Sequence, residues 1–374
     1  MRFPEFSGEW RESKLGDISD IKTGPFGSTL HADDYVENGT PIITTEHFKK
    51  GCLPIIKDGL PQVSEKDRIR LHSYQLHKND IVFSRVGSVD INAKVGEEQE
   101  GWLFSGRVLR VKLFSDNSDY IHYLLSTKVV KDSIASRAVG QTMPSINTQI
   151  LANTPLIKSI DYAEQKKIGC FLSIIDERIA TQSKIIEEQE TLLKSLADKL
   201  FLQNNQSCQL SDIVNIVKGK QLNVDALSEE GEYYVMNGGI TPSGYHSEYN
   251  VPAGAISISE GGNSCGYVQF NEKPFWSGGH CYSLQAQTDI VDYKFIYYFL
   301  KARQTDVMAL RIGSGLPNIQ KKDIEKFTVS FPPLQQQKKF VKALDAVSEK
   351  INTEKQLLEN YRQQKDYLLS KMFI

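Results

Sequence analysis

The side chains best suited to chemistry lie in two short segments of the chain. Ser330-Phe331-Pro332-Pro333-Leu334 is the nearest approach to the Asn/Asp-Pro-Pro-aromatic motif of amino-methyltransferases. It lacks the Asn or Asp that would accept a hydrogen bond from the amine, and Pro-Pro is a common signal for the end of one element and the start of the next. His280-Cys281 has no further ligand nearby in sequence, so a structural role fits this pair better than metal binding.

The motifs of other enzyme classes are missing as well. The sequence has no G-x-x-x-x-G-K-[ST] loop for a nucleotide, no G-x-S-x-G turn for a serine nucleophile and no Pro-Asp followed by Glu/Asp-x-Lys for a nuclease. We therefore expect no catalytic residue, no metal site and no cofactor in this chain.

Length and composition narrow the class of protein. A chain of 374 residues predicts two or three domains. No run of about 18 apolar residues could span a membrane, and the first residues do not resemble a secretory signal. Five scattered cysteines without a CxxC pair predict a reducing, cytoplasmic compartment. The net charge of −2 argues against indiscriminate coating of nucleic acid but permits a reader with local basic patches.

The most informative feature is an internal repeat. Residues 163–201 and 335–373 align without a gap at an offset of 172, and GQTMPSIN (140–147) aligns with GSGLPNIQ (313–320) at 173. The domain starts, at Leu15 and Leu210, are 195 apart, so the first domain carries about 23 extra residues in its middle. A duplicated unit of this kind favours pseudo-two-fold symmetry.

Each copy must end in a long helix. Apolar residues recur at spacings of 3 and 4, typical of a coiled-coil seam, and about 40 residues would make a rod of roughly 60 Å. We expect the two helices to pair antiparallel as a spacer, with Gln182, Gln189, Glu354 and Lys365 as polar positions that set the register. The alternative is two ordinary amphipathic core helices. The expected seam residues are Leu172, Ile179, Ile186, Leu193, Leu200, Leu344, Ile351, Leu358 and Met372.

The segments before the helices predict a mixed α/β fold. Residues 80–84, 108–113 and 255–259 have the composition of strands, while Asp119–Val130 and Asp292–Arg303 are expected to be helices that begin at an Asp cap. The expected parts are a first domain (1–160), a central helical spacer (161–205), a second domain (206–334) and a C-terminal helical spacer (335–374).

This organisation resembles the DNA-specificity subunits of type I restriction–modification enzymes. The residues that carry the resemblance are the segment before each helix, the strand and turn IVFSRVGSV (81–89), and the domain openings WRESKLGDISDIKTG (10–24) and QLSDIVNIVKG (209–219). The resemblance implies that each globular part is a target-recognition domain that reads one half of a bipartite, asymmetric sequence in double-stranded DNA. It implies that the helices set the spacing of the halves, about one turn apart, and dock two modification subunits. Those subunits would bind S-adenosylmethionine and methylate adenine, and two motor-nuclease subunits can join them.

Under this resemblance, polar side chains in loops are the candidates for DNA contact, because Arg suits guanine and Asn or Gln suits adenine. We expect Arg85→Ala to weaken methylation without unfolding the protein. The second domain is shorter and more acidic, and its counterpart of IVFSRVGSV lacks the Arg, which leaves its contacts less defined. The candidates are Lys22, Thr45, Arg85, Ser88, Arg107, Gln141, Asn147, Lys220, Gln221, Asn237, Asn263, Ser264, His280 and Gln320.

Other interpretations of the sequence stay open. Two globular modules on a coiled coil also fit an interaction protein that binds protein or RNA, which would need no methyltransferase partner. The chain could also be the detached recognition part of a fused nuclease–methyltransferase. A true enzyme would show turnover by the purified chain alone. If the helices dock partners, the isolated chain should aggregate because apolar surface is left uncovered.

Overall fold

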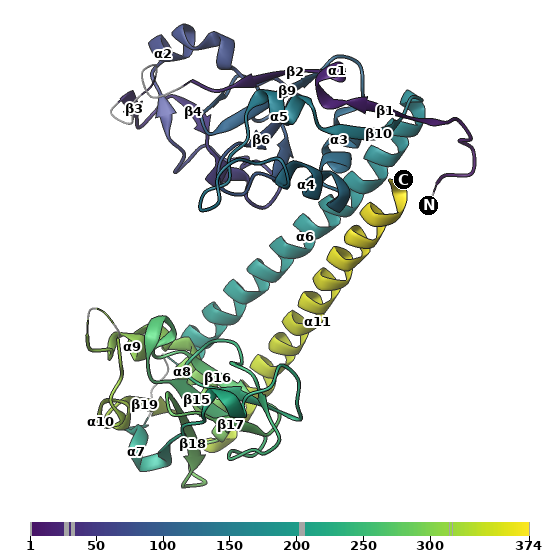
Figure 1. Cartoon of the computed structure of the whole chain (residues 1–374). Helices are drawn as coiled ribbons and strands as arrows, with labels where there is room; N and C mark the ends of the chain where they lie inside the picture. The colour runs from purple at the N-terminus through teal and green to yellow at the C-terminus, as the bar shows by residue number, and fades with distance from the viewer. Residues whose placement is uncertain are drawn as a thin grey trace. The chain divides into compact units, whose positions relative to one another are not determined.

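The computed structural model describes residues 2–25, 30, 34–201, 206–313, 315 and 317–373. The chain divides into two compact units: unit 1 comprises residues 1–182 and 357–374, and unit 2 comprises residues 183–356. Each unit holds one mixed α/β fold and part of each long helix (Figure 1). The predicted boundaries treat the helices as separate spacers and stay a prediction.

Unit 1 is built on two four-stranded sheets. The first is antiparallel with strand order β2-β9-β6-β7, and the second has the order β3-β5-β4-β8, in which β4 and β8 are parallel. Strands β1 and β10 pair separately and bring the two ends of the fold together. The elements are β1 (Trp10–Lys14), α1 (Leu15–Ile18), β2 (Ser19–Thr23), β3 (Tyr35–Val36), β4 (Thr40–Ile43), η2 (Thr45–Phe48), β5 (Gln62–Val63), α2 (Glu65–Arg70), η3 (His72–Tyr74), β6 (Ile81–Ser84), β7 (Asn92–Lys94), β8 (Leu103–Phe104), β9 (Val108–Leu113), α3 (Ser118–Leu125), α4 (Lys128–Ala135), α5 (Thr148–Ala152), β10 (Pro155–Ser159) and the start of α6 (Tyr162–Phe201).

Unit 2 repeats this arrangement. Its main sheet has the order β12-β18-β15-β16, a smaller sheet has the order β14-β13-β17 with β13 and β17 parallel, and β11 pairs with β19. The elements are β11 (Gln206–Gln209), α7 (Leu210–Ile213), β12 (Val214–Lys218), η4 (Val224–Ala226), β13 (Tyr233–Met236), β14 (Tyr245–His246), β15 (Ala255–Ser259), η5 (Gly262–Ser264), β16 (Val268–Asn271), β17 (Phe275–Ser277), β18 (Cys281–Ala286), α8 (Tyr293–Ala302), α9 (Gln304–Ala309), α10 (Lys321–Glu325), β19 (Thr328–Phe331) and the start of α11 (Leu334–Met372).

The predicted repeat is therefore a repeat of topology. The extra length of unit 1 lies between β4 and β6, where residues 44–80 include β5 and α2, whereas only residues 237–254 separate β13 from β15. The predicted strands at 108–113 and 255–259 are β9 and β15, and both are largely or wholly buried.

The two predicted helices at 119–130 and 292–303 have different outcomes. Asp292 caps α8 as expected, because its carboxylate accepts a hydrogen bond from Phe295 N at 3.0 Å. In unit 1 the prediction was wrong in two respects. The cap is Asn117, which accepts from Tyr120 N at 3.0 Å. The segment is also two helices, because Thr127 adopts an extended conformation (ψ 148°) between α3 and α4. Asn and Asp have similar capping preferences, and the sequence offers both in this stretch.

The long helices pack together in antiparallel fashion, as predicted. In unit 1 Lys365 of α11 forms an ion pair with Asp176 of α6 at 2.6 Å, and in unit 2 Lys355 forms one with Glu190 at 2.6 Å. As the residue numbers rise along α11 they fall along the facing stretch of α6, which is the antiparallel arrangement. All nine predicted seam residues are buried or half-buried.

Some seam residues also belong to the cores of the two α/β folds. Leu172 is fully buried in the core of unit 1, together with Tyr120 and Ile121 of α3. Leu344 is fully buried in the core of unit 2 with Phe295 of α8. The ends of the seam therefore bind each fold to its helices, a role that the heptad pattern alone does not reveal.

A buried glutamine joins each α/β fold to its long helix. In unit 1 Gln165 accepts a hydrogen bond from Asn117 N at 2.8 Å and donates to Ser159 O at 2.8 Å. In unit 2 Gln337 accepts from Asp292 N at 2.7 Å and donates to Pro332 O at 2.8 Å. The repeated Gln-Lys-Lys sequence thus serves the same purpose twice: one amide satisfies the backbone where α3 or α8 begins and where the long helix begins.

Candidate nucleic-acid interface

Three loops of unit 1 are held together by backbone hydrogen bonds at one end of the main sheet. Arg85, which follows β6, donates its N–H to Arg107 O at 3.0 Å and accepts from Ile146 N at 2.9 Å. Gly87 N donates to Pro144 O at 2.8 Å. The three loops therefore form one assembly, which we call the unit 1 loop cluster. It comprises residues 85–88 after β6, residues 105–107 between β8 and β9, and residues 139–147 before α5.

The segment before α5 is a small closed loop. Val139 and Ser145 exchange two backbone hydrogen bonds of 2.9 Å, and Gly140 has a φ of 102°. A Cβ at Gly140 would lie 2.8 Å from Met143 O, so glycine is required there. The loop holds Gln141 and its neighbours exposed.

Unit 2 repeats these bonds one for one. Glu260 donates its N–H to His280 O at 2.9 Å and accepts from Ile319 N at 2.9 Å, while Gly262 N donates to Pro317 O at 3.0 Å. Gly313, with a φ of 101°, begins the closed loop before α10. The unit 2 loop cluster (residues 260–264, 278–280, 312–313, 315 and 317–320) is thus the structural equivalent of the unit 1 loop cluster.

At one position of this shared framework the two units carry side chains of opposite charge. Glu260 stands where unit 1 has Arg85, and His280 stands where unit 1 has Arg107. The Arg85 guanidinium donates to Gly106 O at 2.8 Å, so part of its hydrogen-bonding capacity maintains the turn that carries Arg107. Arg107 is exposed. The expected Arg85→Ala effect would therefore include a loosened turn as well as a lost charge.

Several predicted contact residues use their side chains within the protein. Lys22 donates to Ser73 O at 2.9 Å and lies over the Tyr74 ring. Asn147 caps α5 by accepting from Ile150 N at 2.8 Å. Asn237 accepts from His280 N at 3.2 Å. These three are first of all structural residues.

The other predicted residues are more accessible. Thr45 and Ser264 are half-buried, Thr45 where η2 begins and Ser264 where η5 ends. In unit 2 the ends of β12 and β13 meet the turn before β18, because Lys220 N bonds to Ser277 O and Gly278 N bonds to Met236 O, both at 2.8 Å. The exposed predicted residues are Ser88, Arg107, Gln141, Lys220, Gln221, Asn263, His280 and Gln320.

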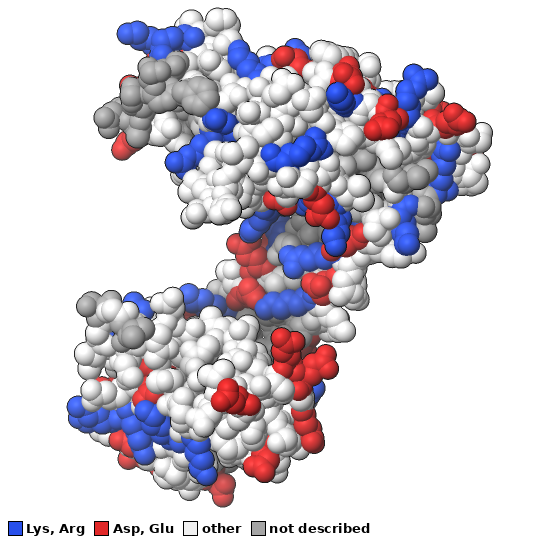
Figure 2. All heavy atoms as spheres, in the orientation of Figure 1, with Lys and Arg blue, Asp and Glu red and all other residues white. Residues whose placement is uncertain are grey.

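Unit 2 carries positive charge in a place that the sequence-based candidates missed. Lys321 and Lys322 open α10 directly after Gln320 and are exposed, whereas α5 of unit 1 begins with Thr148 and Gln149. Lys and Arg side chains gather over the region of α10, beside acidic ones (Figure 2). The repeat alignment could have found these lysines, because they directly follow the matched segment GSGLPNIQ.

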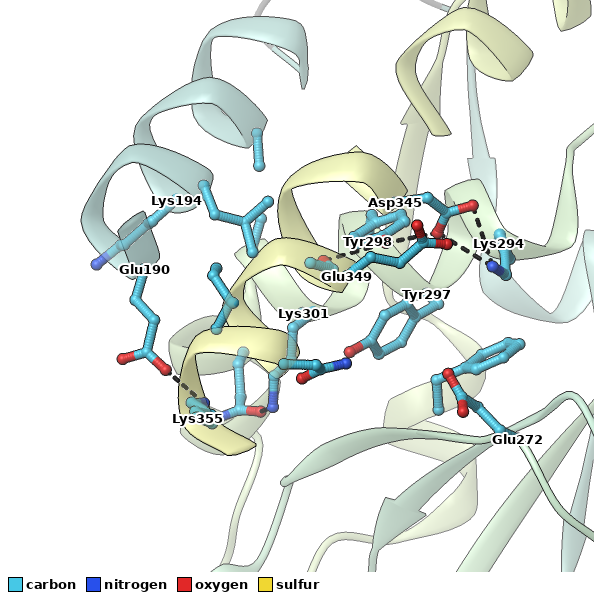
Figure 3. A pocket seen from close by; sticks show the side chains of 18 of the residues that line it. Glu190, Lys194, Glu272, Lys294, Tyr297, Tyr298, Lys301, Asp345, Glu349 and Lys355 are labelled. Carbon is cyan, nitrogen blue, oxygen red and sulfur yellow. Dashed lines mark hydrogen bonds and ion pairs between the residues drawn. The ribbon is translucent and has the colours of Figure 1, made fainter. Parts of the chain in front are cut away.

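Unit 2 also has a cavity of about 800 Å³ between the long helices and α8 (Figure 3). Four of the charged side chains that line it form ion pairs: Glu190 with Lys355 at 2.6 Å, and Lys294 with Asp345 at 3.0 Å. Burial lowers the pKa of Lys301 to about 8, and its ammonium donates to Val268 O at 2.8 Å. The cavity is thus lined by charges of both signs and by aromatic side chains.

Two features are absent from the part of the chain that the structure describes. Within it, no three His, Cys, Asp or Glu side chains come together as a metal site would require. None of its helices is both long enough and apolar enough to cross a membrane.

Burial raises the pKa of the Cys281 thiol to about 11.

Comparison with known proteins identifies the family. Residues 7–191 and 203–360 match the family model described as the type I restriction modification DNA specificity domain, and the chain belongs to this family. The two matches cover the two copies of the repeat.

Relatives in sequence carry the same description. The chain is 30% identical over 183 residues to a protein named a type I specificity subunit in Mycoplasma pneumoniae, a match that covers 48% of each chain. It is 25% identical over 408 residues to a protein of Methanocaldococcus jannaschii named the specificity subunit of the type I restriction enzyme MjaX, covering 98% of this chain and 93% of that one. Specificity subunits are the non-catalytic components of type I enzymes.

Solved structures share the fold. The crystal structure of a type I restriction–modification S subunit from M. genitalium aligns with a TM-score of 0.69 at 22% identity, covering 100% of this chain and 99% of that one. A chain from a structure on complex assembly of the type I system aligns with a TM-score of 0.54 at 14% identity, covering 98% of both.

Proposed function

We propose that the chain reads an asymmetric, bipartite sequence in double-stranded DNA, with one half read by each loop cluster. The observation that carries this proposal is the duplicated backbone framework with different side chains on it. The same hydrogen bonds hold Arg85 and Arg107 in unit 1 and Glu260 and His280 in unit 2. A repeated scaffold with different polar groups would present two similar surfaces to two different half-sites.

The proposal includes two modification subunits docked along the long helices. Its support in unit 1 is the set of apolar side chains left exposed on them, among which Phe171 is 37%, Ile174 45% and Tyr367 54% exposed. In unit 2 the cavity beside α6 and α11 offers paired charges and aromatic groups to a protein surface. One solved structure of similar fold concerns complex assembly of its own type I system.

Cofactor chemistry belongs to the partners in this proposal. The modification subunits would bind S-adenosylmethionine and methylate adenine, and two motor-nuclease subunits can join them for restriction. The chain itself would bind DNA and protein and would work in the compartment that holds the chromosome. Its net charge of −2 fits a reader whose partners supply part of the phosphate contact.

The test is methylation by the reconstituted complex. The purified chain and the modification subunits of its own system would be mixed with S-adenosylmethionine and a randomised DNA library, and the methylated sequences would be read. Arg107→Ala should relax the base preference in one half of the recovered motif. Lys322→Ala should weaken methylation by weakening the contact of unit 2 with DNA, and should leave the half-site read by unit 1 unchanged. A wild-type complex that methylates without sequence preference, or a motif with only one half, would overturn the proposal.

A further inference from the structure

A buried carboxylate lies directly behind an exposed histidine in the unit 2 loop cluster. Glu260 is 4% exposed, whereas the side chain of His280 is 59% exposed. Glu260 Oε2 lies 3.5 Å from His280 Nδ1. We propose that Glu260 is a positioning residue that holds His280 as the DNA-contacting side chain of unit 2, with Nδ1–H facing Glu260 and Nε2 facing outward. This inference rests on the proposed function.

The two oxygens of Glu260 have different surroundings. Oε1 accepts hydrogen bonds from Lys218 Nζ at 2.6 Å and from Tyr282 O–H at 2.9 Å. Oε2 is shielded from solvent and has no hydrogen-bond partner among the described residues. A buried carboxylate oxygen without a donor is costly, and His280 Nδ1 lies 3.5 Å from it. The pair would shorten to a hydrogen bond when the imidazole is fixed against DNA.

The backbone of His280 is already fixed. Its N–H donates to Asn237 Oδ1 at 3.2 Å, and its carbonyl accepts from Glu260 N at 2.9 Å. Only the rotation of the ring is left open, and a carboxylate on one side of an imidazole sets both its orientation and which nitrogen carries a proton. Glu260 therefore supplies what the backbone cannot.

The comparison with unit 1 explains why unit 2 needs this device. Arg107, at the equivalent position, presents several N–H donors on a planar guanidinium without help from a neighbour. An imidazole has two distinct ring nitrogens, and a carboxylate that faces Nδ1–H fixes the ring so that Nε2 faces outward. The change from Arg107 to His280 is thus matched by the change from Arg85 to Glu260. Each cluster would present one oriented polar side chain to DNA, at a base edge or at a phosphate.

The experiment measures binding of the complete complex to a duplex that carries its methylation motif, by fluorescence anisotropy. His280→Ala should weaken binding by about 5- to 100-fold, the loss expected for one good contact. If the contact is to a base, the variant should lose discrimination at one base pair of one half-site. If it is to a phosphate, all sequences should weaken alike and the salt dependence should fall by about one charge. Unchanged binding would overturn the inference.

A double-mutant cycle separates positioning from a merely structural role. Glu260→Gln keeps the shape of the side chain and should reproduce most of the His280→Ala loss. In a His280→Arg background, where there is no imidazole ring to orient, Glu260→Gln should cost nothing further. An equal cost in both backgrounds would show that Glu260 only stabilises the loops and would overturn the proposal. Glu248→Gln, at an exposed site in unit 2, is the matched control.

The same measurements distinguish this inference from the proposed function. A wild-type complex that shows no preference for any sequence would refute the proposed function itself. A wild-type complex with a clear preference that neither variant alters would refute only the role of Glu260 and His280.

Discussion

Replacing Gln337 by Ala tests whether the buried amide fixes the α/β fold of unit 2 to its long helix. The side chain is 0% exposed and makes hydrogen bonds with Asp292 N at 2.7 Å, Pro332 O at 2.8 Å and Ile290 O at 3.2 Å. The bond to Pro332 is fully buried, whereas water can reach the other two groups in part. A buried polar group without a partner costs about 1–3 kcal/mol. We therefore expect Gln337→Ala to lower the free energy of unfolding by about 3 kcal/mol.

The assay combines urea unfolding with hydrogen exchange. The urea midpoint should fall at unchanged m-value, and the amides of α8 should exchange faster because the N–H at its cap has lost its acceptor. Gln336→Ala is the matched control, because Gln336 is the exposed neighbour and its loss should change stability by less than about 0.5 kcal/mol. Equal stability of the two variants would show that the buried amide does not fix the α/β fold to the helix. Gln165→Ala should repeat the effect in unit 1.

Three further predictions concern unit 1. Burial lowers the pKa of His122 to about 4, so the folded state resists protonation that the unfolded state accepts near pH 6.5. The free energy of unfolding should fall by about 2 kcal/mol from pH 7.5 to pH 5, and His122→Asn should remove that loss. A urea midpoint of the parent protein that does not change with pH would contradict this. Asn147→Ala should lose a helix cap worth about 1 kcal/mol, whereas Asn147→Asp should keep the cap. A changed methylation motif in the Asp variant, whose stability is unchanged, would therefore mark a contact of Asn147 with a base. Ile174→Asp should abolish co-purification with the modification subunits, whereas Lys184→Asp, also on α6, should not; retained binding in the first variant would reject docking at this face.

Much of the fold follows from periodicity in the sequence. The spacing of 3 and 4 from Leu172 to Leu200 predicts both the length of α6 and its buried side. One polar interruption of the seam in α11 is also explained, since Lys365 reaches Asp176 of α6 across the helix pair. The break between α3 and α4 was not predictable from this pattern, because Thr127 ends the helix through its own backbone conformation and not through a change in polarity.

The candidate site was harder to predict than the fold. Sequence identifies polar loop residues but cannot tell which of them the protein uses internally. Lys22 and Asn237 illustrate this, because each bonds to a backbone atom of a residue far along the chain, Ser73 and His280 respectively. Glu260 was not among the predicted contact residues, because the comparison of the two repeats shows at this position only that the arginine of the first copy is absent from the second. Its role depends on the 3.5 Å approach to His280, which comes from strands far apart in the chain.

We propose that this chain selects the DNA sequence that its complex modifies. A single-molecule methylome of the host, with the gene intact and with the gene deleted, tests this in the cell. Deletion should remove one asymmetric, bipartite N6-methyladenine motif, and re-expression of the chain should restore it. An unchanged methylome, in cells shown to express the modification subunits, would overturn the proposal and favour an interaction protein that binds protein or RNA.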